Sequence, residues 1–274
     1  MIVDIHNHIL PNFDDGPKDW SEAILLAKQA ADSGITHVFA TPHHKHHHKH
    51  HYYENDPQQI IKVVDEFNHI LKEENISLIV FSGIEYHLHK NIREDMDNNI
   101  NDFLTLNNKG RYILIELPCH SYPQNTEETL YELKSRGFIP ILVHPERNKM
   151  IRKNPVKIYN MVKKGILVQI TAGSVTGLHG KRLKNFSRDL LDHNLVHFIA
   201  SDAHHYLRRK FELISAYNMI ESIYSLQYRT YLEENACSIV DDSNINIYEP
   251  SFIKNKTQYF FLYSHPLNLR VEQK

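Results

Sequence analysis

The sequence predicts an α/β protein in which seven parallel strands close into a TIM-like barrel surrounded by helices. Short apolar runs alternate with longer segments of helical periodicity along most of the chain, which is typical of a parallel sheet with right-handed crossovers. A barrel buries every strand on both faces, and chains of 274 residues commonly form one such unit. We therefore expect a single domain over residues 1–274.

Seven runs rich in apolar and β-branched residues predict the strands. Each run is too short for a helix, and most of them end at a glycine, a proline or a polar cluster. The third run ends at Glu85, and the fourth carries Glu116 near its end. The strands are expected at residues 1–5, 36–40, 76–84, 112–118, 139–143, 167–171 and 197–200.

Capping residues mark the starts of several helices between these strands. Asp19 precedes Glu22 by three residues, and Asp56 and Asn154 each precede a proline, which is favoured at the first helical position. Residues 91–106 have a weaker helical pattern because they are polar. The helices are expected from Asp19 to Gly34, from Pro57 to about Asn75, from Glu127 to Arg136, from Asn154 onward, and from Lys181 to His193.

Side chains of metal-ligand type follow six of the seven predicted strands, at the end where barrel enzymes carry their active sites. Side chains alternate along a strand, so His6 and His8 point to the same side, and Gly16 lets the Asp14-Asp15 turn fold back over them. Nitrogen and carboxylate ligands without thiolate favour a catalytic centre of several ions over structural zinc. The candidates are His6, His8, His43, Glu85, Glu116, His144, Asp202 and His204.

The chain contains 21 histidines, many of them in one segment that begins at His43. Only His43 follows a predicted strand directly, so the pattern favours a flexible, solvated loop for residues 46–51. The alternative is a loop at the mouth of the site that attracts phosphate when it is protonated or delivers metal. Lys45 and Lys49 favour the attraction of anions.

Composition excludes several classes of protein. The formal net charge of −2 provides no basic field for nucleic acid, and no apolar run is long enough for membrane insertion. The first residues do not resemble a signal peptide, and two cysteines do not form a disulfide framework, so we expect a cytoplasmic protein. The segment from about residue 238 to 274 carries no candidate ligand and its role is unassigned, although its run Gln258–Tyr263 predicts a packed strand or helix.

Six motifs, taken in chain order, resemble those of the polymerase-and-histidinol-phosphatase (PHP) superfamily of metal-dependent phosphoesterases. They look most like the bacterial tyrosine-protein phosphatases encoded with capsular and exopolysaccharide genes. The resemblance covers roughly residues 1–225 and implies a distorted seven-stranded barrel with three divalent ions, manganese being expected and iron or zinc being alternatives. The motifs are His-Asn-His from residue 6, Asp-Asp-Gly from 14, Thr-Pro-His-His from 41, Gly-Ile-Glu from 83, His-Pro-Glu-Arg from 144 and Ser-Asp-Ala-His from 201.

The resemblance also implies how the ligands are shared. Glu85 would serve two ions, and Glu116 departs from many relatives, which have histidine at that position. The implied sets are His6, His8, Glu85 and Asp202 for one metal, Glu85, Glu116 and His144 for a second, and Asp15, His43 and His204 for the third.

Two arginines are the candidate catalytic and substrate-binding residues. Arg147 lies three residues after His144, and Arg209 lies seven residues after Asp202, which matches the spacing in the family; the adjacent Arg208 is an alternative. A guanidinium can grip two phosphoryl oxygens at once, while a hydroxide activated by the metals attacks phosphorus. The sequence identifies no general acid.

The resemblance implies hydrolysis of phosphotyrosine in a protein substrate, specifically the tyrosine-rich tail of a kinase that regulates capsule synthesis. One alternative is a PHP phosphatase of a small phosphomonoester such as histidinol phosphate, or a nuclease of the same superfamily. An alternative of another class is a non-catalytic metal-binding protein, which would not require Arg147 or Arg209. The sequence does not indicate the oligomeric state.

Overall fold

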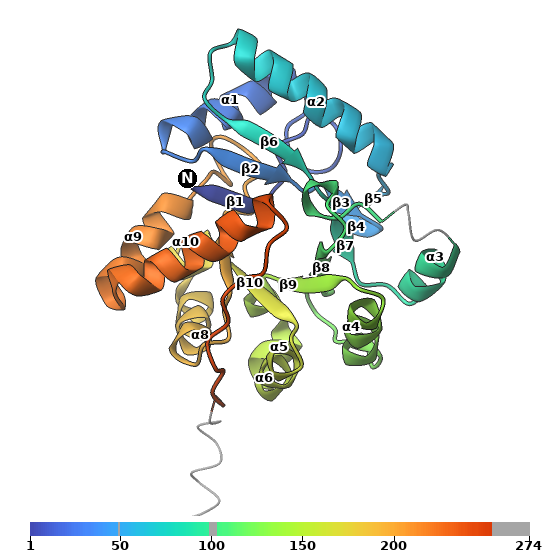
Figure 1. Cartoon of the computed structure of the whole chain (residues 1–274), viewed down its shortest axis with the longest axis vertical. Coiled ribbons are helices and arrows are strands. Elements are labelled where there is room, and N and C mark those ends of the chain that lie inside the picture. Colours follow the sequence, from blue (N-terminus) through green and yellow to red (C-terminus); the bar gives the residue numbers. More distant parts are fainter. Residues whose placement is uncertain (49, 99–102, 254–274) are drawn as a thin grey trace, which may run out of the picture.

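The computed structural model describes residues 1–48, 50–98 and 103–253. Their strands form two parallel sheets and one hairpin, surrounded by helices (Figure 1). The first sheet has the order β1-β2-β6, and the second has the order β11-β10-β9-β8-β7-β3. The strands are β1 (Val3–Asn7), β2 (His37–Ala40), β3 (His43–His44), β6 (Ile79–Ser82), β7 (Glu85–His87), β8 (Tyr112–Glu116), β9 (Ile139–Val143), β10 (Leu167–Thr171) and β11 (Phe198–Ala200).

The predicted third strand, residues 76–84, is wrong in its extent because the chain changes sheets there. β6 pairs with β2 in the first sheet, whereas β7 pairs with β3 in the second. The same change separates β2 from β3 at Pro42, which has no N–H for a strand ladder. Glu85 therefore begins a strand of its own.

The two sheets also meet beside β1. The main-chain N–H of Asp202 donates to the His6 carbonyl at 2.9 Å, and that of His8 donates to the Ala203 carbonyl at 2.8 Å. Strand pairing among the described residues gives two linked sheets, so the predicted single closed barrel of seven strands is not confirmed. The predicted α/β class with parallel strands is confirmed.

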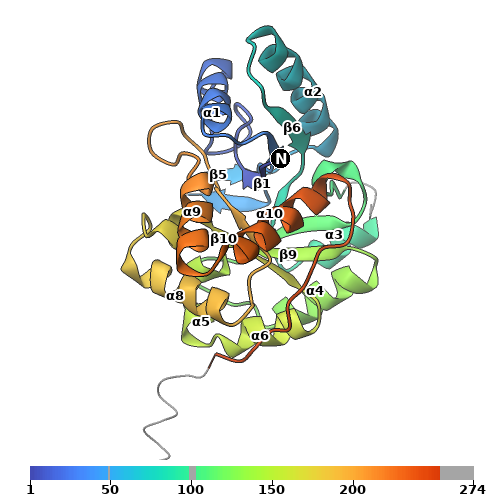
Figure 2. The same ribbon diagram turned by 60° about the vertical axis from the view of Figure 1, so that its left-hand side comes forward.

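Helices cover the sheets in the order expected from alternating strands and helices. α1 and α2 lie against the first sheet, and α4, α5, α6 and α8 lie along the second (Figure 1). α9 and α10 lie side by side in both ribbon views (Figure 2). The helices are α1 (Trp20–Asp32), α2 (Pro57–Glu73), α3 (Ile92–Asn98), α4 (Thr126–Ser135), α5 (Lys149–Lys153), α6 (Val156–Lys163), α7 (Ala172–Thr176), α8 (Lys181–Asp192), α9 (Leu213–Ile223) and α10 (Leu226–Val240), with 3-10 turns at Leu106–Asn108 and Pro145–Arg147.

Two of the three predicted caps are confirmed. Asp19 accepts a hydrogen bond from the Glu22 N–H, and Asp56 accepts one from the Gln59 N–H, each at 2.9 Å. The predicted cap by Asn154 is wrong, because Asn154 ends α5 by donating its own N–H to carbonyls of that helix. α6 consequently begins without a side-chain cap.

An apolar core joins strands of both sheets. It includes Ile5 and Phe39 from the first sheet, Leu114 and Phe198 from the second, and Ile239 of α10. This packing fixes the relative positions of the strand ends, from which the candidate ligands extend.

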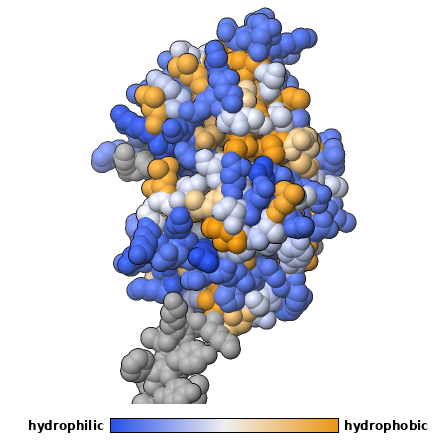
Figure 3. Space-filling model, turned by 90° about the vertical axis from the view of Figure 1, so that its left-hand side faces the viewer, coloured by the Kyte–Doolittle hydropathy of each residue, from blue (hydrophilic) through white to orange (hydrophobic). Residues whose placement is uncertain are grey.

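No helix in the described part of the chain is both long and apolar enough to cross a membrane. On the face shown in Figure 3, apolar residues occur in small groups between hydrophilic ones. The predicted run Gln258–Tyr263 lies outside the described residues.

Candidate metal centre

The first group of ligand atoms extends from the end of β1 and the loop after β11. The Nε2 atoms of His6 and His8 lie 3.3 Å apart, so the predicted convergence of these two rings is confirmed. Asp202 Oδ1 lies 3.3 Å from His8 Nε2 and 3.8 Å from His6 Nε2. All three side chains are buried.

Hydrogen bonds behind the rings determine which nitrogen faces the centre. In three histidines Nδ1 meets an acceptor oxygen and must carry the proton, which leaves Nε2 with a lone pair. Two facing Nε2 lone pairs cannot hydrogen-bond to each other, but both can coordinate the same cation. The acceptors are Gln169 Oε1 for His6 at 3.1 Å, Asp14 Oδ2 for His8 at 2.6 Å and the Asp202 carbonyl for His204 at 2.9 Å.

Glu85 forms the second group with His6 and His144, lies at the middle of the cluster and is fully buried. Its Oε1 lies 2.8 Å from His144 Nε2, and its Oε2 lies 2.7 Å from His43 Nδ1. The same Oε2 is 3.4 Å from the Nε2 atoms of both His6 and His8. One carboxylate therefore faces four imidazoles, the position expected of a ligand shared between ions.

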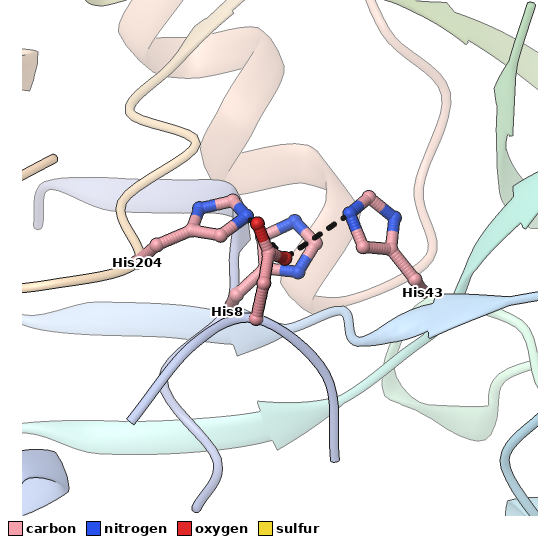
Figure 4. Close-up of side chains that lie close together, drawn as sticks. His8, His43 and His204 are labelled. Carbon is pink, nitrogen blue, oxygen red and sulfur yellow. Dashed lines mark ion pairs between the residues drawn. The ribbon is translucent and has the colours of Figure 1, made fainter. Parts of the chain in front are cut away.

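The third group combines His8, Asp15, His43 and His204, whose ligand atoms lie within 4.8 Å of one another. Figure 4 shows the three rings turned toward the same space. Asp15 Oδ1 lies 3.2 Å from His204 Nε2 and 3.5 Å from His43 Nε2. Burial is the largest cause that lowers the pKa of His204 to about 4, so its ring is neutral at pH 7, as a metal ligand must be.

The donor atoms fit divalent metal ions. Glu85 Oε2, His43 Nδ1 and His204 Nε2 are buried and lie close to other ligand atoms, but among the described residues none of these contacts has the geometry of a hydrogen bond. Buried polar atoms usually have such partners, and here they point toward one another across a shared space. Imidazole nitrogens and carboxylate oxygens together suit manganese, iron or zinc.

Two histidines that the sequence does not single out hold Glu116. His46 Nδ1 and His87 Nδ1 donate to Glu116 Oε2 at 2.7 and 2.9 Å, while Oε1 lies 4.0 Å from His144 Nε2. Burial and the charge of Glu85 raise the pKa of Glu116. The hydrogen bonds from the two imidazoles lower this pKa by more, so it lies below its usual value. Glu116 remains a carboxylate with one oxygen facing the centre.

The predicted solvated loop over residues 46–51 is therefore wrong at His46. β4 (His46–His48) pairs antiparallel with β5 (His51–Tyr53), and this hairpin carries His46 into the site. His46 is buried, whereas its neighbour His47 is exposed.

Replacement of His46 by alanine is expected to weaken metal binding by roughly tenfold to a hundredfold, the usual effect of losing an outer partner of a ligand. His47→Ala removes a histidine from the same hairpin but no contact with Glu116, so it serves as the matched control. Chelator-competition titration of both variants measures the affinities. Equal affinities in His46→Ala and His47→Ala would show that His46 does not support the centre.

Two arginines lie at the opening of the cluster of ligand side chains. Asp202 Oδ2 receives Arg147 Nη1 at 2.5 Å and Arg209 Nη2 at 3.0 Å, while its Oδ1 faces the histidines. The side chains of Arg147 and Arg209 are 23% and 38% exposed, compared with 2% for Asp202. Their guanidinium groups therefore lie between the buried ligands and solvent.

A family model described as capsular polysaccharide synthesis, CpsB/CapC, matches residues 2–241. The chain belongs to this family. It is 37% identical over 260 residues to the tyrosine-protein phosphatase YwqE of Bacillus subtilis, covering 95% of this chain and 100% of that protein. It is 40% identical over 217 residues to the putative tyrosine-protein phosphatase CapC of Staphylococcus aureus, covering 79% and 82% of the two chains.

A solved structure is also similar to this CpsB/CapC family member, with a TM-score of 0.86 and 38% identity over 93% of this chain and 100% of the other. It comes from the crystal structures of YwqE from Bacillus subtilis and CpsB from Streptococcus pneumoniae, which are described as unique metal-dependent tyrosine phosphatases. The resemblance inferred from the sequence motifs is confirmed.

The turn predicted after β1 in this CpsB/CapC chain has the expected shape. A Cβ on Gly16 would lie 2.3 Å from the His8 carbonyl oxygen, so only glycine allows this close approach. Asp14 does not face the third group; it accepts from His8 Nδ1 and from the His43 N–H at 2.9 Å. Asp14 orients two ligands from behind, as Gln169 orients His6.

The structure brings all nine predicted metal ligands of this CpsB/CapC protein into one cluster, with both predicted arginines at its edge. His46, His87, Asp14 and Gln169 are the participants that the sequence analysis does not identify. Asp14 has a sequence signal in the Asp-Asp-Gly motif, and His46 has one in the histidine-rich segment, whose alternative interpretation is a loop at the mouth of the site. His46, His87 and Gln169 belong to strands whose pairing is needed to place them.

Proposed function

We propose that this protein is a metal-dependent protein-tyrosine phosphatase of capsular polysaccharide synthesis. Three divalent ions, with manganese as the expected metal, would be held by the three groups of buried ligands. The observation that carries the proposal is the convergence of these groups around Glu85, directly beneath Arg147 and Arg209. A non-catalytic metal-binding protein would need the ligands but not the two guanidinium groups at the opening.

The residues divide the work between holding ions and binding the phosphoryl group. His6, His8 and Asp202 would hold one ion together with Glu85. Glu85 would also hold a second ion, together with His144 and Glu116. Asp15, His43 and His204 would hold the third. Bound divalent ions supply Lewis acidity, which activates water and neutralises phosphoryl charge.

Arg147 and Arg209 are placed to bind the oxygens of the transferring phosphoryl group. Charge on these oxygens has to be matched in the transition state, and guanidinium donors supply it without reorganisation. Asp202 orients both arginines through Oδ2 while Oδ1 faces the ligand group. The same carboxylate therefore links the phosphate-binding residues to the metal ligands.

The tyrosyl leaving group has a pKa near 10, well below that of an alkyl alcohol, so it can depart with little proton assistance. We further propose that the substrate is the tyrosine-rich tail of a kinase that regulates capsule synthesis, and that the protein acts in the cytoplasm.

The proposal is tested with a panel of substrates offered to chelator-treated protein to which manganese is returned. A phosphotyrosine peptide should be hydrolysed faster than a phosphoserine peptide, histidinol phosphate or single-stranded DNA. Preference for histidinol phosphate or for DNA would replace the protein-tyrosine-phosphatase proposal with the corresponding alternative.

Neither cysteine is expected to act as a nucleophile. Cysteine-dependent tyrosine phosphatases need an arginine six residues after the cysteine, whereas Cys119 and Cys237 have Asn125 and Ser243 there. Desolvation raises the pKa of both thiols, so the reactive thiolate is disfavoured. Cys119→Ser combined with Cys237→Ser should retain most of the rate of phosphopeptide hydrolysis, and chelation should abolish it. Loss of the rate in the double variant at unchanged metal content would contradict the metal-based mechanism.

A further inference from the structure

A cationic cavity, separate from the candidate metal centre, lies between α5 and α8. Its volume is about 420 Å³, and it is lined by Lys149, Arg152, Lys153 and Arg182, together with Phe186 and Asp189. Four positive side chains thus face one negative side chain. Within the part of the chain that the structure describes, none of the four cations forms an ion pair with a carboxylate.

Two side chains of the cavity wall, Arg152 and Phe186, are held by their surroundings. Arg152 is half-buried, and its Nη1 donates to the Glu146 main-chain carbonyl at 2.6 Å. Burial and the nearby charge of Arg182 lower the pKa of Arg152, and the carboxylate of Glu146 offsets this lowering only in part, so the charges of the two guanidinium groups act on each other. Phe186 is mostly buried, with 8% of its surface exposed, and this exposed part is apolar and lines the cavity beside the cations.

The position of the cavity connects it to the phosphoryl-binding arginines. Lys149 follows Arg147 by two residues, a span of at most about 7 Å. On the other side, His179 and Arg209 line a neighbouring cavity of about 320 Å³, and Arg182 lies three residues after His179. The short separations in sequence between Arg147 and Lys149 and between His179 and Arg182 therefore place the cationic cavity close to the opening of the site.

We infer that this cavity is a binding site for a second phosphorylated tyrosine on the same substrate chain. The inference rests on the proposed phosphotyrosine phosphatase function and assigns a substrate class to it. Paired guanidinium groups match the oxygens of a phosphate, and the Phe186 surface suits an aryl ring. An extended peptide advances about 3.3 Å per residue, so the second phosphotyrosine would lie about three residues from the one being hydrolysed.

The test compares two peptides that share one hydrolysable phosphotyrosine. About three residues away, on either side, one peptide carries tyrosine and the other carries a non-hydrolysable phosphonate analogue of phosphotyrosine. The wild type should hydrolyse the phosphonate-bearing peptide with roughly tenfold higher kcat/KM, since several surface charge pairs add up. In the double variant Arg152→Ala with Arg182→Ala this advantage should disappear, while hydrolysis of the other peptide should be unchanged.

Lys28→Ala with Lys62→Ala is the matched control, because it removes the same charge from exposed positions on α1 and α2 and should keep the advantage. An advantage that is absent in the wild type, or that survives in the Arg152 and Arg182 variant, would overturn the inference.

A binding measurement separates this inference from the proposed function. Fluorescence anisotropy of a labelled peptide with phosphonate at both positions needs no hydrolysis. Weaker binding by the Arg152 and Arg182 variant, but not by the lysine control, supports the site even if no peptide is hydrolysed. Equal binding by all three proteins refutes the site even if phosphotyrosine hydrolysis is observed.

Discussion

Replacement of Glu85 by glutamine is expected to release more than one metal ion per chain. It should also reduce the rate of phosphopeptide hydrolysis by more than roughly a hundredfold, which is the effect of losing a residue that only supports a metal ligand. The substitution keeps the size of the side chain and removes its charge. Glu85 faces His6, His8, His43 and His144 within 3.4 Å, so its charge offsets the cations of two adjacent groups at once.

Metal analysis and steady-state kinetics on the same preparations measure both effects. Glu66→Gln is the matched control, since it makes the same chemical change at an exposed position of α2 and should leave metal content and rate unchanged. Full metal occupancy in Glu85→Gln would place this residue outside the centre.

Replacement of Arg147 by alanine should cut turnover by roughly a hundredfold or more, the effect of losing one donor to transition-state charge. Metal content should be retained, because Asp202 Oδ2 still receives Arg209 Nη2 at 3.0 Å and Oδ1 still faces the histidines. Arg147→Lys should recover little of the rate, since an ammonium group lacks the two-pronged geometry.

Arg188→Ala is the control for this loss of charge, because Arg188 is 64% exposed on α8. Steady-state rates with a phosphotyrosine peptide, measured alongside metal content, distinguish two roles for Arg147. A normal rate in Arg147→Ala would remove the residue from the mechanism, and a low rate with lost metal would make it a support for Asp202 alone.

The positions of most strands could be predicted from the sequence because the alternation of side chains and the turn residues are local properties, although β1 ends at Asn7 and not at residue 5, and β8 ends at Glu116 and not at residue 118. The runs around Val3, Tyr112, Ile139 and Leu167 are short, apolar and bounded by polar or turn residues, and each forms a strand in the second sheet or at the start of the first. Parallel pairing then brings their carboxyl ends together, which explains why the candidate ligands cluster.

The change of sheet between β6 and β7 could not be predicted, because it depends on long-range pairing. The run before Glu85 reads as one strand, but Pro42 interrupts the neighbouring strand and the pairing partner changes from β2 to β3. Local propensity contains no information about a pairing partner 42 residues away in the chain, as His43 is from Glu85.

The supporting residues could not be predicted for a related reason. His46 and His87 are separated by 41 positions from each other in a histidine-rich background, and only the packing of the hairpin against β7 and β8 shows that both reach Glu116. Gln169 is an ordinary polar residue in an apolar strand, and its role becomes visible only from its contact with His6 Nδ1.

Phosphate release by metal-free protein is the measurement that tests the metal-dependent phosphatase proposal most directly. The protein is stripped with a chelator, Mn²⁺ is returned in steps, and phosphate released from a phosphotyrosine peptide is measured at each step together with bound metal. We expect no release by the stripped protein and a rate that rises with bound manganese until three ions are held. Undiminished release by the metal-free protein would contradict the proposal.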